Sequence, residues 1–201
     1  MAIKFPPDMA EEAKREELME DDVMFSLKKS IQLINQARRH IDEVILYNLN
    51  KQSAKDGVVF VATKYHEAST TIDNALAYML QTLQYARGIE QIAKDLADKT
   101  GGKKSVLGKN EMATVNYFDK IADSIDTERA RLRGANTALE NALKMDQALI
   151  FSKYRNIAEN LRKDLRIIVD KLTTFLKMII ELKKLMNKIE LFAGVSPAFK
   201  R

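Results

Sequence analysis

The two histidines are the first residues to consider for chemistry, because imidazole is a common metal ligand and a general base near neutral pH. A zinc-binding His-Glu-x-x-His helix would need a second histidine at position 70, which is Thr70. A di-iron bundle needs a glutamate three residues before each histidine. Those positions hold Ala37 and Thr63. Both motifs are absent, so His40 and His66 are expected to be ordinary surface or boundary residues.

Carboxylates and hydroxyls offer two further sites. Asp119, Asp123 and Asp126 share one face of a predicted helix, and such a stripe could hold a hard cation if other oxygen ligands joined it. The same spacing is typical of a solvated face, which is the interpretation we favour. The hydroxyl run 69–71 could form a polar layer between helices, since only His66 lies near enough in sequence to activate a hydroxyl. The chain has no cysteine, which excludes thiolate chemistry and Cys-ligated metals.

Basic residues could attract phosphate groups. The segment 101–105 (Gly-Gly-Lys-Lys-Ser) lacks the spacing of a phosphate-binding loop. Arg129 and Arg133 share a helix face, whereas Arg131 points elsewhere. No aromatic residues alternate with these basic residues as base stacking would require. We therefore interpret them as a solvated face and do not favour a nucleic-acid partner. The last predicted helix carries a basic face formed by Lys163, Lys177, Lys184 and Lys188.

Turn-forming residues are scarce, with 7 Gly and 3 Pro among 201 residues, and this favours a few long helices over a β-sandwich or barrel. The hydrophobic fraction of 46% is that of a folded chain. No apolar run approaches the ~18 residues of a transmembrane helix. Residues 1–14 contain no apolar core of a signal peptide. We expect a cytoplasmic protein, or one exported by a route that does not use a Sec signal peptide.

Apolar residues recur at alternating steps of three and four in four stretches, which begin near Val23, Val61, Phe118 and Phe151. The sequence thus predicts an all-α fold, an elongated antiparallel (up-down-up-down) four-helix bundle with coiled-coil-like packing. The first helix should begin at Pro6-Pro7-Asp8.

The breaks between the helices follow from glycine and capping residues. A loop is predicted at 51–57, a second at 101–109, and a helix start near Asn110. The third and fourth helices should separate at 144–147, where Asp146 can cap a new helix. The alternative is one continuous helix with a stutter.

Charge is distributed unevenly along the chain. Residues 1–22 carry eight acidic and three basic residues, whereas residues 151–201 carry twelve basic and five acidic ones. We divide the chain into an acidic N-terminal arm (1–22), a helical bundle (23–193) and a C-terminal tail (194–201). An even number of helices would bring the two ends together, which would explain the asymmetry without an external partner.

The apolar face of the last helix is wider than a two-stranded seam needs, and this predicts a partner surface. We assign to that surface the flanking residues Val169, Leu176, Met178 and Leu185. The expected function is non-enzymatic protein–protein interaction or self-assembly, as a scaffold, adaptor or structural component, without metal, cofactor, catalytic residue or small-molecule substrate. The alternative is a membrane-active protein, a pore-forming or translocator component that uses amphipathic residues 172–192 at a membrane surface.

Overall fold

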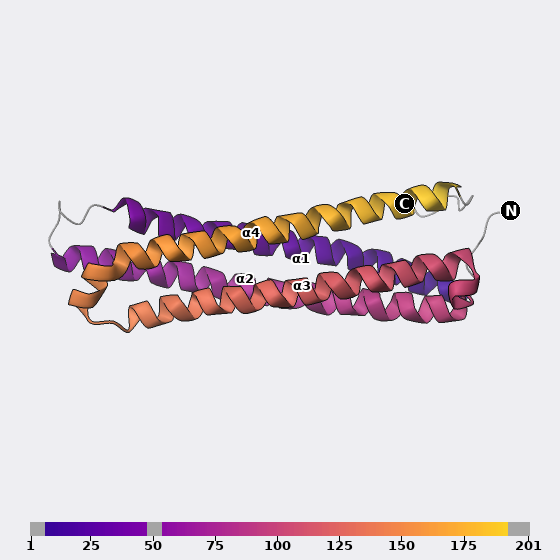
Figure 1. Cartoon of the computed structure of the whole chain (residues 1–201), viewed down its shortest axis with the longest axis horizontal. Coiled ribbons are helices and arrows are strands. Elements are labelled where there is room, and N and C mark those ends of the chain that lie inside the picture. The colour runs from indigo at the N-terminus through magenta and orange to yellow at the C-terminus, as the bar shows by residue number, and fades with distance from the viewer. Residues whose placement is uncertain (1–6, 48–53, 193–201) are drawn as a thin grey trace. The chain divides into compact units, whose positions relative to one another are not determined.

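The computed structural model describes residues 7–47 and 54–192, and these are almost entirely helical (Figure 1). The elements are α1 (Pro7–Leu46), α2 (Ala54–Lys99), the short 3-10 helix η2 (Gly102–Lys104), α3 (Val106–Leu143) and α4 (Gln147–Phe192). No strand occurs in the described ranges, so the predicted all-α class is confirmed. The helix η2 was not predicted, and the predicted tail 194–201 lies outside the described residues. Within those ranges no helix is apolar over a length that would cross a bilayer.

The first helix begins at a proline, Pro7, whose fixed backbone angle and missing N–H suit the first helical position. α1 then continues for 40 residues without a break, through the position where we divided arm from bundle. The buried residues Met9, Glu16 and Glu20 lie in this acidic stretch. The stretch is therefore helical and packed over the residues that the structure describes.

The prediction that a loop extends to residue 57 is wrong. α2 already begins at Ala54, so Asp56 and Gly57 are helical. The Asp56 carboxylate lies in the first turn, where the helix dipole favours negative charge. Asp-Gly therefore belongs to a helix start here and not to a turn.

The connection between α2 and α3 depends on three glycines and a serine. Gly101 has a left-handed φ of 89°, which ends the α2 segment at low steric cost. The Ser105 side chain accepts a hydrogen bond from the Gly108 N–H at 2.9 Å and caps α3. α3 thus begins four residues before the predicted Asn110. A Cβ on Gly108 would lie 2.1 Å from the carbonyl oxygen of Gly102, so only glycine allows this close approach.

The predicted break between the third and fourth helices is confirmed. α3 ends at Leu143 and α4 begins at Gln147. The Asp146 carboxylate accepts a hydrogen bond from the Leu149 N–H at 2.8 Å, as an N-cap does. The alternative of one continuous helix is wrong.

The contacts divide the chain into two compact units. Unit 1 comprises residues 1–25, 82–124 and 174–201, and unit 2 comprises residues 26–81 and 125–173. Each long helix supplies one segment to each unit. The contacts between segments inside each unit are those of a helical bundle.

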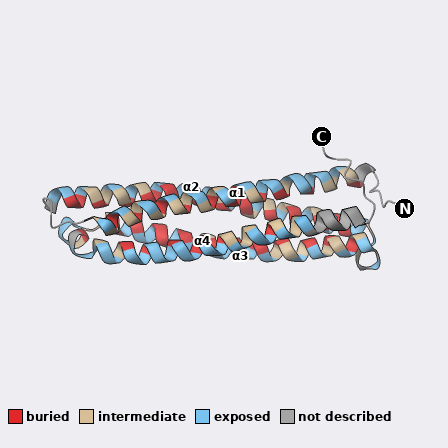
Figure 2. Cartoon of the chain, turned by 90° about the horizontal axis from the view of Figure 1, so that it is seen from above, coloured by how far each residue is buried: buried red, intermediate tan, exposed pale blue. Residues whose placement is uncertain are grey.

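Buried residues repeat along each helix at the predicted intervals (Figure 2). In unit 2 the largest fully buried side chains are Leu27, Ile34, Ile41, Tyr65, Ile72, Met79, Ile125, Leu132 and Leu139. In unit 1 they are Ile89, Leu96 and Phe118. The apolar periodicity of the sequence therefore identifies the core.

Unit 2 also contains hydrogen bonds between helices in its interior. The Ser69 hydroxyl of α2 donates to the Asn136 Oδ1 of α3 at 2.8 Å, and the Asn136 amide donates to Asp73 at 2.7 Å. The Tyr65 hydroxyl of α2 donates to the Tyr154 carbonyl of α4 at 2.5 Å. Polar groups that must find partners restrict how the helices can be aligned.

Candidate interaction surfaces beside α4

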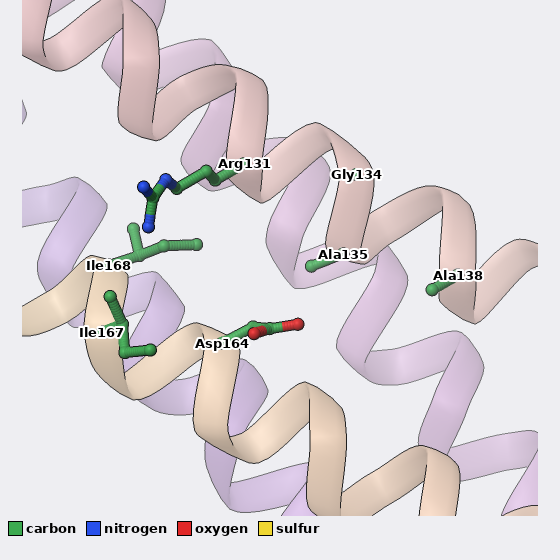
Figure 3. A pocket seen from close by; sticks show the side chains of 7 residues that line it. All are labelled: Arg131, Gly134, Ala135, Ala138, Asp164, Ile167 and Ile168. Atoms are coloured by element: carbon green, nitrogen blue, oxygen red, sulfur yellow. The ribbon is translucent and has the colours of Figure 1, made fainter.

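Two grooves of unit 2 lie beside α4. The first lies between α3 and α4 and has a volume of about 330 Å³. In Figure 3, α3 contributes Arg131, Gly134, Ala135 and Ala138, and α4 contributes Asp164, Ile167 and Ile168. We call it the apolar groove, because its floor is made of small and aliphatic side chains.

Two features show that the apolar groove is open and not filled from within. Ile167 keeps 38% of its surface exposed. A Cβ built on Gly134 would meet no atom within 4 Å, and the backbone of Gly134 is not in the left-handed region. Among the residues that the structure describes, no contact or turn explains a glycine at this position, although glycine in a helix interior costs about 1 kcal/mol relative to alanine.

The apolar groove has one charged side chain of each sign. Arg131 of α3 lies 3.8 Å from Glu128 on its own helix, a long contact for an ion pair. Asp164 of α4 is exposed and has no ion pair among the described residues. The groove therefore has little net charge.

The second groove lies between α1 and α4 and has a volume of about 500 Å³. We call it the basic groove, because it is lined by four cationic and two acidic side chains: Arg38, Asp42, Glu159, Arg162, Lys163 and Arg166. Both carboxylates are already engaged. Asp42 lies 2.9 Å from the Arg162 Nε, and Glu159 lies 3.2 Å from the Arg155 Nε.

The remaining cations of the basic groove lack close counter-charges. Within the described part of the chain, neither Arg38 nor Lys163 has an acidic group at ion-pair distance. Arg166 approaches Asp170 at only 3.9 Å. The groove is therefore positively charged after its internal ion pairs are counted.

The structure separates the residues predicted to bind a partner. Val169 is only 8% exposed and belongs to the core of unit 2. Leu176 is half-buried in unit 1, and Met178 is 41% exposed there. The side chain of Leu185 lies outside those that the structure describes. A partner surface on α4 stays a prediction, and of these residues Met178 is the most accessible described one.

The four lysines predicted as a basic face fall in both units of the chain, and their common face stays a prediction. Lys163 lines the basic groove of unit 2, whereas Lys177 and Lys184 are exposed in unit 1. The side chain of Lys188 is outside the described set. Sequence reasoning missed Arg38, which lines the same groove as Lys163 although it lies on α1, far away in the sequence.

The aspartate stripe has its counter-ion inside the protein. Arg87 of α2 contacts Asp119 at 2.6 Å, Asp123, and Glu90 at 2.7 Å. The hydrogen bonds that Arg87 donates, first to Glu90 and then to Asp119, raise the pKa of Arg87 above its usual value. Asp126 is exposed. Among the described residues no group of three or more possible ligands is arranged to hold a metal ion.

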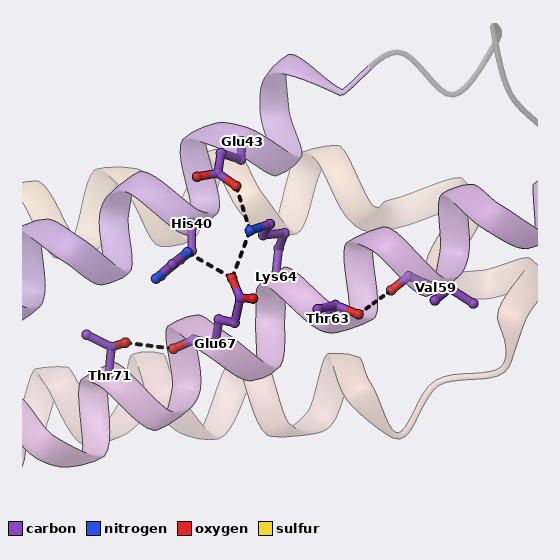
Figure 4. Close-up of polar contacts among 7 residues, drawn as sticks. All are labelled: His40, Glu43, Val59, Thr63, Lys64, Glu67 and Thr71. Carbon is purple, nitrogen blue, oxygen red and sulfur yellow. Dashed lines mark hydrogen bonds and ion pairs between the residues drawn. The ribbon is translucent and has the colours of Figure 1, made fainter.

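One histidine takes part in a polar cluster between α1 and α2 (Figure 4). The His40 Nδ1 lies 3.1 Å from Glu67, and the Lys64 Nζ lies 2.8 Å from Glu43 and 2.9 Å from Glu67. The hydrogen bond from Lys64 lowers the pKa of Glu67, and the bonds to Glu43 and Glu67 raise the pKa of Lys64. His66 is exposed. The cluster joins two helices by charge and hydrogen bonding.

The hydroxyl run 69–71 is engaged in structural hydrogen bonds. The Thr71 hydroxyl donates to the Glu67 carbonyl at 2.7 Å, and Ser69 donates to Asn136 as described above. Only the Ser69 bond joins two helices, since Thr71 bonds within α2 and Thr70 is exposed.

The chain matches no known family model, no curated protein and no solved structure. Its function is therefore argued from the chemistry of its own surfaces.

Proposed function

We propose that this chain is a non-enzymatic helical-bundle protein that acts by self-association, with a second copy docked on the apolar groove of unit 2. We also propose that the four long helices run up-down-up-down with coiled-coil-like packing. The three-four alternation of apolar residues and the comparable lengths of 40, 46, 38 and 46 residues support that topology.

The observation that carries the proposal is the open space over Gly134 beside the exposed Ile167. A residue without a side chain lets a second backbone come close, and small residues serve this purpose where helices approach one another. A helix docked there would cover Ile167 and fill the groove. Burying an isoleucine side chain completely stabilises by about 1.5–3 kcal/mol, so covering its exposed part contributes a fraction of that on each copy.

Charge supports a second copy as the partner. A surface that carries Arg131 and Asp164 bears both signs, so it can face a copy of itself without net repulsion. In a two-fold dimer each contact between unlike residues occurs twice, which doubles the effect of every favourable pair.

The experiment is size-exclusion chromatography with light scattering across a concentration series. The monomer mass is 22.9 kDa, and the wild-type chain should approach twice that mass as concentration rises. Ile167→Lys should shift the equilibrium to monomer, because it places a charge in the apolar groove. Val59→Lys is the matched control, since Val59 is also an exposed aliphatic residue of unit 2 but does not line the groove.

A second pair of variants tests the space over Gly134. Gly134→Gln should also favour monomer, whereas Ala77→Gln, at an exposed position of α2, should not. Circular dichroism should show unchanged helicity in all four variants. A wild-type chain that stays at the monomer mass at every concentration, or a Val59→Lys variant that dissociates as much as Ile167→Lys, would rule out the groove as the interface.

A further inference from the structure

We propose that the basic groove of unit 2 binds a compact polyphosphate anion, the chemistry of a pyrophosphate group. This site lies on the α1 side of α4 and is independent of the self-association proposed above.

The first argument is the number of charges left after internal pairing. Asp42 is neutralised by Arg162 at 2.9 Å and Glu159 by Arg155 at 3.2 Å. Arg38 and Lys163 have no acidic partner among the described residues, and Arg166 has only a contact of 3.9 Å to Asp170. The lining carries four positive and two negative side chains, so the groove presents an excess of positive charge to a ligand.

The second argument is geometry. The cations come from two helices, with Arg38 on α1 and the others on α4, and they line an open groove of about 500 Å³. This is the size of a small-molecule site. Arg38 is half-buried, so part of its side chain is already held in place by packing. A basic face on one helix would offer a ligand cations from one side only, whereas here they come from two helices.

The third argument is the match of donors to acceptors. Arginine presents a planar fork of N–H donors that pairs with two oxygens of one phosphate, and lysine adds a point charge. Two linked phosphate groups carry three to four negative charges in a few atoms. They can therefore pair with Arg38, Arg166 and Lys163 at once, whereas a single phosphate carries fewer negative charges and spans a shorter distance.

The test is isothermal titration calorimetry of the full chain with inorganic pyrophosphate at low ionic strength. One pyrophosphate should bind per chain, at least about tenfold more tightly than orthophosphate, since each further charged hydrogen bond contributes roughly that factor. Arg38→Met and Lys163→Met should each weaken binding about tenfold, because each removes the charge while keeping an unbranched side chain. Lys171→Met is the matched control, because Lys171 is an exposed cation of α4 in unit 2 that does not line the groove.

A variant that gains affinity separates binding from folding. Asp42→Asn removes a negative charge from the groove and releases the Arg162 guanidinium, so pyrophosphate should bind several-fold more tightly. Misfolding cannot produce this gain. Circular dichroism and thermal melting should show that every variant is folded.

Three results would overturn the proposal. Pyrophosphate could fail to bind, or bind no more tightly than orthophosphate. Lys171→Met could weaken binding as much as Arg38→Met, which would indicate diffuse attraction over the surface. A single-stranded oligonucleotide could bind more tightly than pyrophosphate at equal phosphate concentration. If Lys171→Met weakened oligonucleotide binding as much as Arg38→Met, the result would indicate an extended nucleic-acid surface.

Discussion

Replacing Gly134 by alanine should make the monomer more stable. The backbone of Gly134 is not in the left-handed region, and the added Cβ would meet no atom within 4 Å. The change should therefore yield most of the ~1 kcal/mol by which alanine exceeds glycine in a helix interior. In a chain of this size, 1 kcal/mol raises the melting temperature by about 2–4 °C.

Two other helical glycines provide the comparison. At Gly108 the new Cβ would lie 2.1 Å from the Gly102 carbonyl oxygen, which belongs to the backbone and cannot move without disturbing η2. Overpacking of this kind costs about 1–3 kcal/mol, so Gly108→Ala should destabilise despite its better helix propensity. At Gly88 the Cβ would lie 2.1 Å from the Met19 Cε, the end of a flexible side chain that can rotate away. Gly88→Ala should fall between the other two variants.

The assay is urea unfolding followed by circular dichroism, at a concentration where light scattering shows only monomer. The free energy of unfolding should rank Gly134→Ala above Gly88→Ala and Gly108→Ala lowest. A Gly134→Ala variant less stable than wild type would refute the reasoning, because a contact that requires glycine would then exist within the chain. The same methyl group should weaken self-association at higher concentration. If Gly134→Ala raises both the free energy of unfolding and the tendency to self-associate, then no second helix approaches closely at Gly134.

Four other substitutions test contacts within the units. Asn136→Ala should cost about 1–3 kcal/mol in urea unfolding, because the residue is only 5% exposed and its two hydrogen-bonded partners on α2 would lose their bonds. Arg87→Met should cost under about 1 kcal/mol in urea unfolding at low salt and nothing at high salt, because the three ion pairs it removes are exposed and screened by added ions. Tyr65→Phe should cost about 1 kcal/mol through its lost hydrogen bond, whereas Tyr117→Phe should be neutral or slightly stabilising, because that hydroxyl has no partner among the described residues. Burial raises the pKa of Tyr117 from 10.0 to about 12, so this tyrosine ionises in the unfolded chain before it ionises in the folded one. The free energy of unfolding should therefore fall between pH 10 and pH 12, and it should fall less in Tyr117→Phe.

The core could be predicted from the sequence because the residues on the buried face of a helix recur at the period of the helix. Leu27, Ile72 and Leu132 lie in the apolar stretches that begin near Val23, Val61 and Phe118, and all three are fully buried. Helix ends were harder to predict where two residues could both act as caps. Ser105 and Asn110 are equally suitable N-caps by residue type. The structure uses Ser105, because η2 occupies residues 102–104 and Ser105 follows it directly.

The surfaces could not be predicted in the same way, because they depend on how residues from different helices align. Arg87 and Asp119 are 32 residues apart, and nothing local to either one indicates the other. Val169 looked like a flank of the apolar stripe and is buried, whereas Ile167 was not singled out and lines an open groove. Only the opposite charges of the chain's two ends were visible in the sequence. They meet in unit 1, where the Lys183 Nζ lies 2.7 Å from Asp21.

The two grooves beside α4 should respond to salt in opposite directions, because one is apolar and the other is cationic. Ions screen the attraction between Arg38, Lys163 and a polyphosphate, so affinity at the basic groove should fall as salt is added. A salt that strengthens the burial of apolar surface, such as ammonium sulfate, should instead favour association around Ile167. Sulfate also competes directly for the cations of the basic groove, which widens the difference. One titration with this salt, followed by light scattering and by pyrophosphate binding, therefore separates the two activities. If both decline together, then either association also depends on charge or the two grooves are not independent sites.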